Sequence, residues 1–127
     1  MDGNEFIRRH GNEKAALAKF LADKGVSVDA VCEQIGGPLF DIFVSELTMM
    51  GKMLEYAVGS AKAKDIQSVA QCGAQAKRQK DAAYHVLMAG GIKPFDGNDY
   101  AGPLRDYVMS RYDNCIGECE KILADRS

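Results

Sequence analysis

Residues 38–58, PLFDIFVSELTMMGKMLEYAV, predict a long helix that carries two apolar stripes instead of one. Both stripes advance by three or four residues, which is the spacing of one helix face. The first stripe consists of Phe40, Phe43, Leu47, Met50, Leu54 and Ala57. The second stripe consists of Leu39, Ile42, Met49, Met53 and Tyr56, and Glu46 interrupts it. A helix with two stripes is expected to be enclosed by neighbours or to keep one face for a partner.

Glycines divide the chain before this helix into shorter predicted helices. We expect a short first helix over residues 3–10 that ends at Gly11, because Arg8-Arg9-His10 supplies cations that suit a helix C-terminus. A second helix is expected over residues 13–24. A third is expected over residues 28–35, ended by the glycine pair that precedes Pro38.

The second half of the chain predicts two more long helices. Asp65 is a candidate N-cap for a helix that runs to about residue 89 and is closed by Gly90 and Gly91. A loop dense in turn residues follows, and its oxygen donors at 96–99 lack the spacing of a calcium loop. Pro103 then opens a last helix that runs to about Ala124.

The predicted helices favour an all-α fold. The long helices have similar lengths and are joined by short connections, which is typical of an antiparallel bundle. No segment shows the two-residue alternation of an amphipathic strand. We therefore expect one domain over residues 1–127, an antiparallel helical bundle of about four main helices with a short N-terminal helix.

Composition and charge exclude several classes of function. The 127 residues carry 16 Lys and Arg against 18 Asp and Glu, a net charge of −2 that provides no general attraction for nucleic acid. Residues 16–35 have the outline of a helix-turn-helix, but the second helix carries Asp29 and Glu33 and no basic residue. No apolar run approaches the roughly 18 residues of a membrane span, and the first residues do not resemble a secretory signal. We expect a cytoplasmic protein.

The four cysteines are then expected to be thiols. Cys115 and Cys119 stand four residues apart, so both project from one face of the last helix, where they could bind a thiophilic metal. Cys72 and His85 would have to supply the remaining ligands. Because Cys115 and Cys119 also fall on the apolar stripe of that helix, the favoured interpretation is core packing, with no cofactor.

His85 is the other candidate for chemistry. It stands four residues after Asp81 and seven after Arg78, so all three are expected on nearby faces of one helix. An Asp–His pair could act as a general acid or base, and an Arg–His pair could serve a phosphodiester. Nothing else in the chain supports an active site. An enzyme is therefore the third hypothesis, behind two binding roles.

The leading hypothesis is a protein that acts by protein–protein interaction, as an adaptor, a chaperone-like binder or an inhibitor. Its partner would be another protein or a second copy of itself, bound through Met49, Met53 and Tyr56 on the second stripe. The alternative is a protein that binds a small ligand or a thiophilic metal in the bundle interior.

Overall fold

The computed structural model describes residues 1–93 and 100–125, and in this part of the chain the fold is all-α, as the sequence predicts. The predicted turn at residues 96–99 lies outside the described residues. None of the described helices is long and apolar enough to cross a membrane. The helices are α1 (Gly3–Asp23), α2 (Val28–Ile35), α3 (Gly37–Lys62), α4 (Ile66–Ala89) and α5 (Ala101–Ala124).

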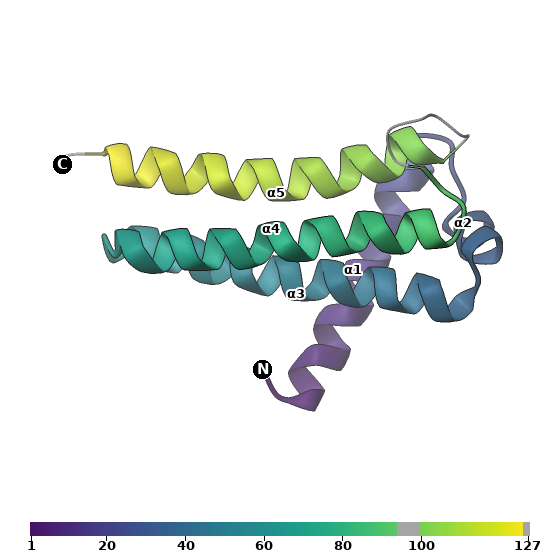
Figure 1. Ribbon diagram of the computed structural model, residues 1–127, viewed down its shortest axis with the longest axis horizontal. Helices are drawn as coiled ribbons and strands as arrows, with labels where there is room; N and C mark the ends of the chain where they lie inside the picture. The colour runs from purple at the N-terminus through teal and green to yellow at the C-terminus, as the bar shows by residue number, and fades with distance from the viewer. Residues whose placement is uncertain (94–99, 126–127) are drawn as a thin grey trace.

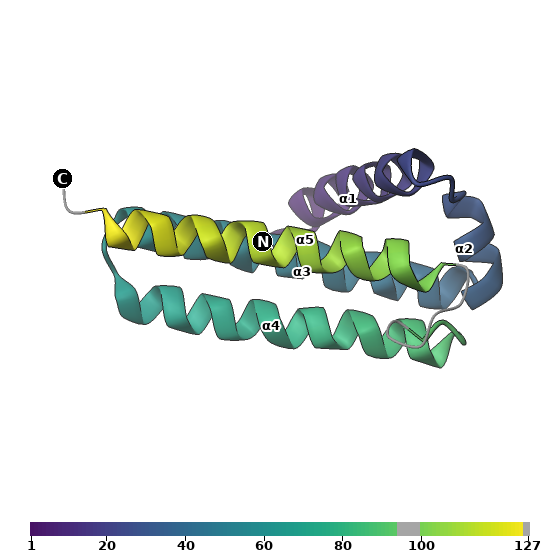
Figure 2. The ribbon, with the colours of Figure 1, turned by 90° about the horizontal axis from the view of Figure 1, so that it is seen from above.

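Three long helices form the body of the molecule. α3, α4 and α5 lie side by side and alternate in direction (Figure 1). α1 crosses them steeply, and its N-terminal end projects beyond them. Seen from above, α1 and α4 lie on opposite sides of α3 and α5 (Figure 2). α3 therefore has neighbours on several sides, and it contacts each of the other four helices.

The first stripe of α3 lies in the core, enclosed by the neighbouring helices. Its six side chains are at most 3% exposed. All of them except Ala57 belong to one buried cluster with Leu17 and Leu21 from α1, Leu87 from α4, and Leu104 and Val108 from α5. Ala57 packs in a smaller cluster with Ala61 and Cys119. Complete burial of an aliphatic or aromatic side chain contributes about 1.5–3 kcal/mol. This stripe therefore contributes substantially to the stability that holds the helices together.

The predicted short N-terminal helix is wrong, because the first two predicted helices form one helix, α1, which runs without a break from Gly3 to Asp23. Gly11 lies inside this helix and does not end it. A glycine in a helix interior costs about 1 kcal/mol relative to alanine, which the surrounding helical residues outweigh. Arg9 and His10, read from the sequence as helix-terminal cations, instead reach acidic side chains of α3. α1 is therefore tethered along its length.

The other boundaries agree with the sequence to within a few residues. α2 is followed by Gly36, whose φ of 89° suits glycine. The Asp65 carboxylate caps the start of α4 by accepting a hydrogen bond from the Ser68 backbone N–H. α3 continues past its predicted end to Lys62, and α5 begins at Ala101, before Pro103. The turn after α3 contains Lys64, which has a left-handed φ of 59°.

Candidate functional site

The second stripe of α3 is partly open to solvent. Ile42 and Tyr56, near its two ends, are each 46% exposed, and Leu39, Met49 and Met53 are half-buried. Leu39 and Met53 also pack against the main core. The predicted partner-binding residues therefore lie on an apolar strip along α3 that the rest of the described chain covers only in part.

The N-terminal half of α1 borders this strip. The Lys52 ammonium lies 4.8 Å from the centre of the Tyr56 ring and 3.0 Å from Glu5 Oε1 of α1. The Lys52 side chain is only 9% exposed, so it is held between the two helices. A cation over the face of an aromatic ring is attracted by the ring quadrupole. Lys52 therefore links Tyr56 at one end of the second stripe to Glu5 of α1.

The four residues considered as metal ligands do not form one set. Cys72 and Cys119 belong to a small cluster where α3, α4 and α5 meet, and Cys115 is one turn from Cys119. His85 is exposed and lies thirteen residues after Cys72, about 20 Å further along α4. Within residues 1–93 and 100–125, no three His, Cys, Asp or Glu side chains are placed to hold a metal ion together.

Burial also makes the cysteines less suited to metal binding. It raises the pKa of the Cys115 thiol and the pKa of the Cys119 thiol, so both are neutral near pH 7. The thiolate is the form that binds a metal or attacks an electrophile. Cys119, at 2% exposed, therefore serves the packing of α5 against α3 and α4.

The side chains considered for acid–base chemistry lie on the outer surface of α4. Arg78, Asp81 and His85 are all exposed. The Arg78 guanidinium donates to Gln75 Oε1 at 2.8 Å, one turn earlier. In the described chain, no hydrogen bond or ion pair joins His85 to Asp81 or to Arg78. This face therefore provides separate solvated groups and no assembled catalytic pair.

A polar pocket between α1, α3 and α5 is the feature that the sequence did not reveal. Its volume is about 330 Å³, at the small end of the range for ligand sites. The pocket is lined by Arg9, Asn12, Glu13, Ala16, Thr48, Gly51, Glu55 and Arg111.

The inner wall of the polar pocket is a buried ion pair. Glu13 is 6% exposed, and both of its carboxylate oxygens lie 2.7 Å from Nη1 of Arg111. The Tyr107 hydroxyl donates to Glu13 Oε2. Burial, the Glu13 charge and this hydrogen bond all raise the pKa of Tyr107, so the phenol stays protonated. Burial is the largest single influence on Arg111 and lowers its pKa, but the neighbouring Glu13 and Tyr107 together outweigh burial and the pKa rises overall.

A glycine on α3 makes room for this arginine. A Cβ placed on Gly51 would lie 2.6 Å from Nη2 of Arg111, closer than side-chain carbons approach other atoms. The guanidinium therefore lies directly against the α3 backbone. A glycine inside a helix lowers the stability of that helix. At position 51 the missing side chain leaves the space in which Arg111 packs.

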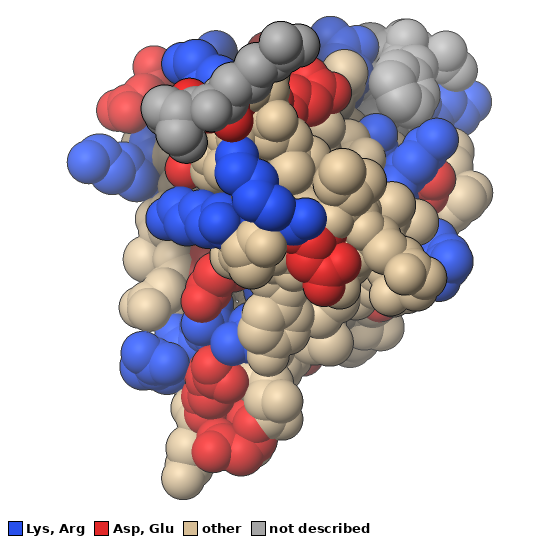
Figure 3. All heavy atoms as spheres, turned by 90° about the vertical axis from the view of Figure 1, so that its left-hand side faces the viewer, with Lys and Arg blue, Asp and Glu red and all other residues tan. Residues whose placement is uncertain are grey.

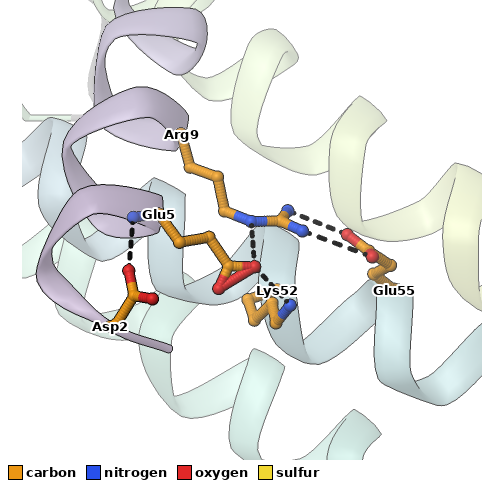
Figure 4. A network of polar contacts seen from close by, with 5 residues as sticks. All are labelled: Asp2, Glu5, Arg9, Lys52 and Glu55. Atoms are coloured by element: carbon orange, nitrogen blue, oxygen red, sulfur yellow. Dashed lines mark hydrogen bonds and ion pairs between the residues drawn. The ribbon is translucent and has the colours of Figure 1, made fainter.

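The mouth of the polar pocket is part of a second charged network, shown in Figure 4. Arg9 of α1 donates to both carboxylate oxygens of Glu55 on α3, at 2.8 and 3.3 Å, and its Nε donates to Glu5 at 3.3 Å. Lys52 also donates to Glu5. The hydrogen bond from Lys52 lowers the pKa of Glu5, and the hydrogen bonds from Arg9 lower the pKa of Glu55.

A weak sequence signal for the polar pocket exists in hindsight. Glu13 stands four residues before Leu17 and eight before Leu21, so it continues the buried face of α1. Tyr107 and Arg111 are likewise four residues apart on α5. An acidic residue in line with buried leucines predicts a buried carboxylate that needs a cationic partner. The sequence does not indicate which cation meets it, since Arg111 is 98 residues away.

Basic side chains gather at the end of the molecule where the turn from α3 to α4 lies beside the end of α5 (Figure 3). Lys62, Lys64 and Lys121 line a shallow hollow there. The Lys64 ammonium donates to the backbone carbonyls of Ile122 and Asp125, at 2.8 and 3.1 Å. These carbonyls lie at the C-terminal end of α5, where a cation is favourable. Lys64 therefore ties the end of α5 to the turn between α3 and α4.

Comparison of the chain with known protein families, with curated proteins and with solved structures finds no match.

Proposed function

We propose that this chain is a helical-bundle protein that acts by protein–protein interaction through the second stripe of α3, and that the partner is a second copy of itself. The observation that carries the proposal is the exposure of Ile42 and Tyr56 at the two ends of this stripe, 46% each. Burying the exposed part of each of these two side chains against a partner would contribute about 1 kcal/mol to binding.

The spacing of the second stripe supports a helical partner. From Ile42 the positions step to Glu46, Met49, Met53 and Tyr56 by four, three, four and three residues. This alternation is the repeat by which two helices pack side chains between one another. α3 also presents flexible methionines at the middle of the stripe, and methionine adapts its shape to a facing surface.

The position of Glu46 supports a second copy aligned antiparallel. In a two-fold arrangement centred between Met49 and Met53, each of these methionines faces the other in the second copy. The same symmetry places residue 46 opposite residue 56. The Tyr56 hydroxyl of one copy can then donate to the Glu46 carboxylate of the other, so the one charged position on the stripe gains a partner.

The experiment is sedimentation velocity of the purified chain over a range of concentrations, with two matched variants. Met49→Glu places a charge at the centre of the proposed interface. Met109→Glu makes the same change on α5, at a side chain that is 39% exposed and is not part of the second stripe. Circular dichroism of both variants checks that the helices are retained.

We expect a concentration-dependent dimer that Met49→Glu abolishes and Met109→Glu leaves intact, with helix content unchanged in both. A chain that stays monomeric at every concentration contradicts the proposed second copy. Loss of helix content in Met49→Glu alone would also contradict the proposal, because Met49 would then belong to the core and not to a surface for binding.

A further inference from the structure

We propose that the polar pocket between α1, α3 and α5 binds a small monocarboxylate, with the guanidinium of Arg111 as its anchor. This inference is independent of the proposed interface, which lies on another face of α3. It follows from the hydrogen-bonding groups that the pocket leaves without a partner.

The acidic groups of the pocket are already engaged. Both Glu13 oxygens accept from Arg111, and both Glu55 oxygens accept from Arg9. The Thr48 hydroxyl donates to the Val44 carbonyl at 2.8 Å. The pocket therefore has little acceptor or negative charge to offer a cationic ligand.

The donors are only partly used. Arg111 engages Glu13 and Tyr107 through Nη1 alone, which leaves Nη2 and Nε without a described protein partner. The Arg111 side chain is 34% exposed, so a molecule in the pocket can reach it. Asn12 is exposed, lines the same pocket and has no hydrogen-bond partner among the described side chains. Two N–H groups on one edge of a guanidinium match the two oxygens of a carboxylate.

The charges of the surroundings favour a single negative charge. Arg9 and Arg111 are balanced by Glu55 and Glu13, so the lining is neutral before a ligand binds. A monoanion adds one charge beside a guanidinium. A phosphate dianion would bring a second negative charge within reach of the two glutamates, which would repel it. The remaining lining at Ala16 and Gly51 is small, which leaves space for a short ligand.

The test is a nuclear magnetic resonance titration of the isotope-labelled chain with sodium propionate, with sodium chloride at matched ionic strength as the reference. We expect saturating shifts of the Arg111 Nε–H signal and of the Asn12 and Gly51 amides. Asn12→Ala, which removes one donor, should weaken binding about five- to tenfold. Shifts that sodium chloride reproduces, or that do not saturate, would overturn the proposal.

A matched pair of variants separates pocket binding from general effects. Ala16→Met fills the pocket from α1 without touching its charged groups, and Ala15→Met places the same side chain on α1 outside the pocket lining. Propionate binding should be lost in Ala16→Met and unchanged in Ala15→Met. Equal binding by the two variants would place the ligand elsewhere, and tighter binding of inorganic phosphate than of propionate would overturn the assignment to a monocarboxylate.

Discussion

α1 is joined to the rest of the molecule by two arginine–carboxylate pairs that differ in burial, and this difference predicts a difference in stability. Glu13 pairs with Arg111, and its side chain is 5% exposed. Glu55 pairs with Arg9, and its side chain is 57% exposed. Replacing each glutamate by glutamine keeps the shape and removes the charge, so the two variants compare the same chemical change in two environments.

Glu13→Gln should lower the free energy of unfolding by about 2 kcal/mol. Removing one partner of a fully buried ion pair costs about 3–5 kcal/mol, because the other charge is left without compensation. Arg111 is one-third exposed, so water recovers part of this cost, and the Tyr107 hydroxyl can still donate to the glutamine oxygen. Glu55→Gln should cost about 0.5 kcal/mol or less, as is usual for exposed pairs.

Urea unfolding followed by circular dichroism measures both effects. With a slope of about 2 kcal/mol per M, the midpoint should fall by roughly 1 M for Glu13→Gln and by less than about 0.3 M for Glu55→Gln. In 1 M salt the screening length is about 3 Å, so the effect of Glu55→Gln should vanish and that of Glu13→Gln should persist. Equal midpoints for the two variants, or equal loss of both effects in salt, would refute the reasoning from burial.

Two further predictions concern glycine packing and acid. Gly59→Ala should raise the free energy of unfolding by about 0.5–1 kcal/mol, because an added Cβ meets nothing within 4 Å. Gly90→Ala should lower the free energy of unfolding by about 1–3 kcal/mol, because its Cβ would lie 2.5 Å from the Ile35 Cβ. Thermal unfolding of both variants checks the opposite signs. The folded chain lowers the pKa of Glu5 and the pKa of Glu55. Their ionised carboxylates therefore stabilise the docking of α1 above the ordinary glutamate pKa of about 4.3, and this contribution is lost as the pH falls through their lowered pKa values. Protection of the α1 amides against hydrogen exchange, taken relative to the unfolded-chain exchange rate at each pH, should therefore fall in acid before the protection of α3 does. A simultaneous fall in both helices would contradict this.

Local signals were sufficient to predict much of the fold. Asp65 and Gly90 bound α4 as predicted because capping depends on residues within one turn of the helix end. The two stripes of α3 were recognisable because helical spacing depends on the local sequence alone, but the spacing did not decide which stripe is buried. Gly11 was misread because the cost of an internal glycine is small, and whether it ends a helix is decided by contacts on both sides of it.

The polar pocket could not be predicted because its contacts are distant in sequence. Arg9 meets Glu55 across 46 residues, and Glu13 meets Arg111 across 98. Charge alone does not select these partners, since the chain has 16 basic and 18 acidic residues. The steep crossing of α1 selects them, and this crossing depends on the packing of Leu17 against the core.

The buried pair in the polar pocket is a poor means of gaining stability, and this bears on its role. Apolar side chains of similar volume at two such positions are often as stabilising as an ion pair, or more so, because they incur no cost of desolvation. Here the chain also keeps a glycine in the middle of α3, so that the Arg111 guanidinium can lie against the backbone. A packing role alone would be better served by an apolar residue at 111 and alanine at 51. The arrangement instead presents an arginine edge to a pocket, which is what recognition of an anion requires.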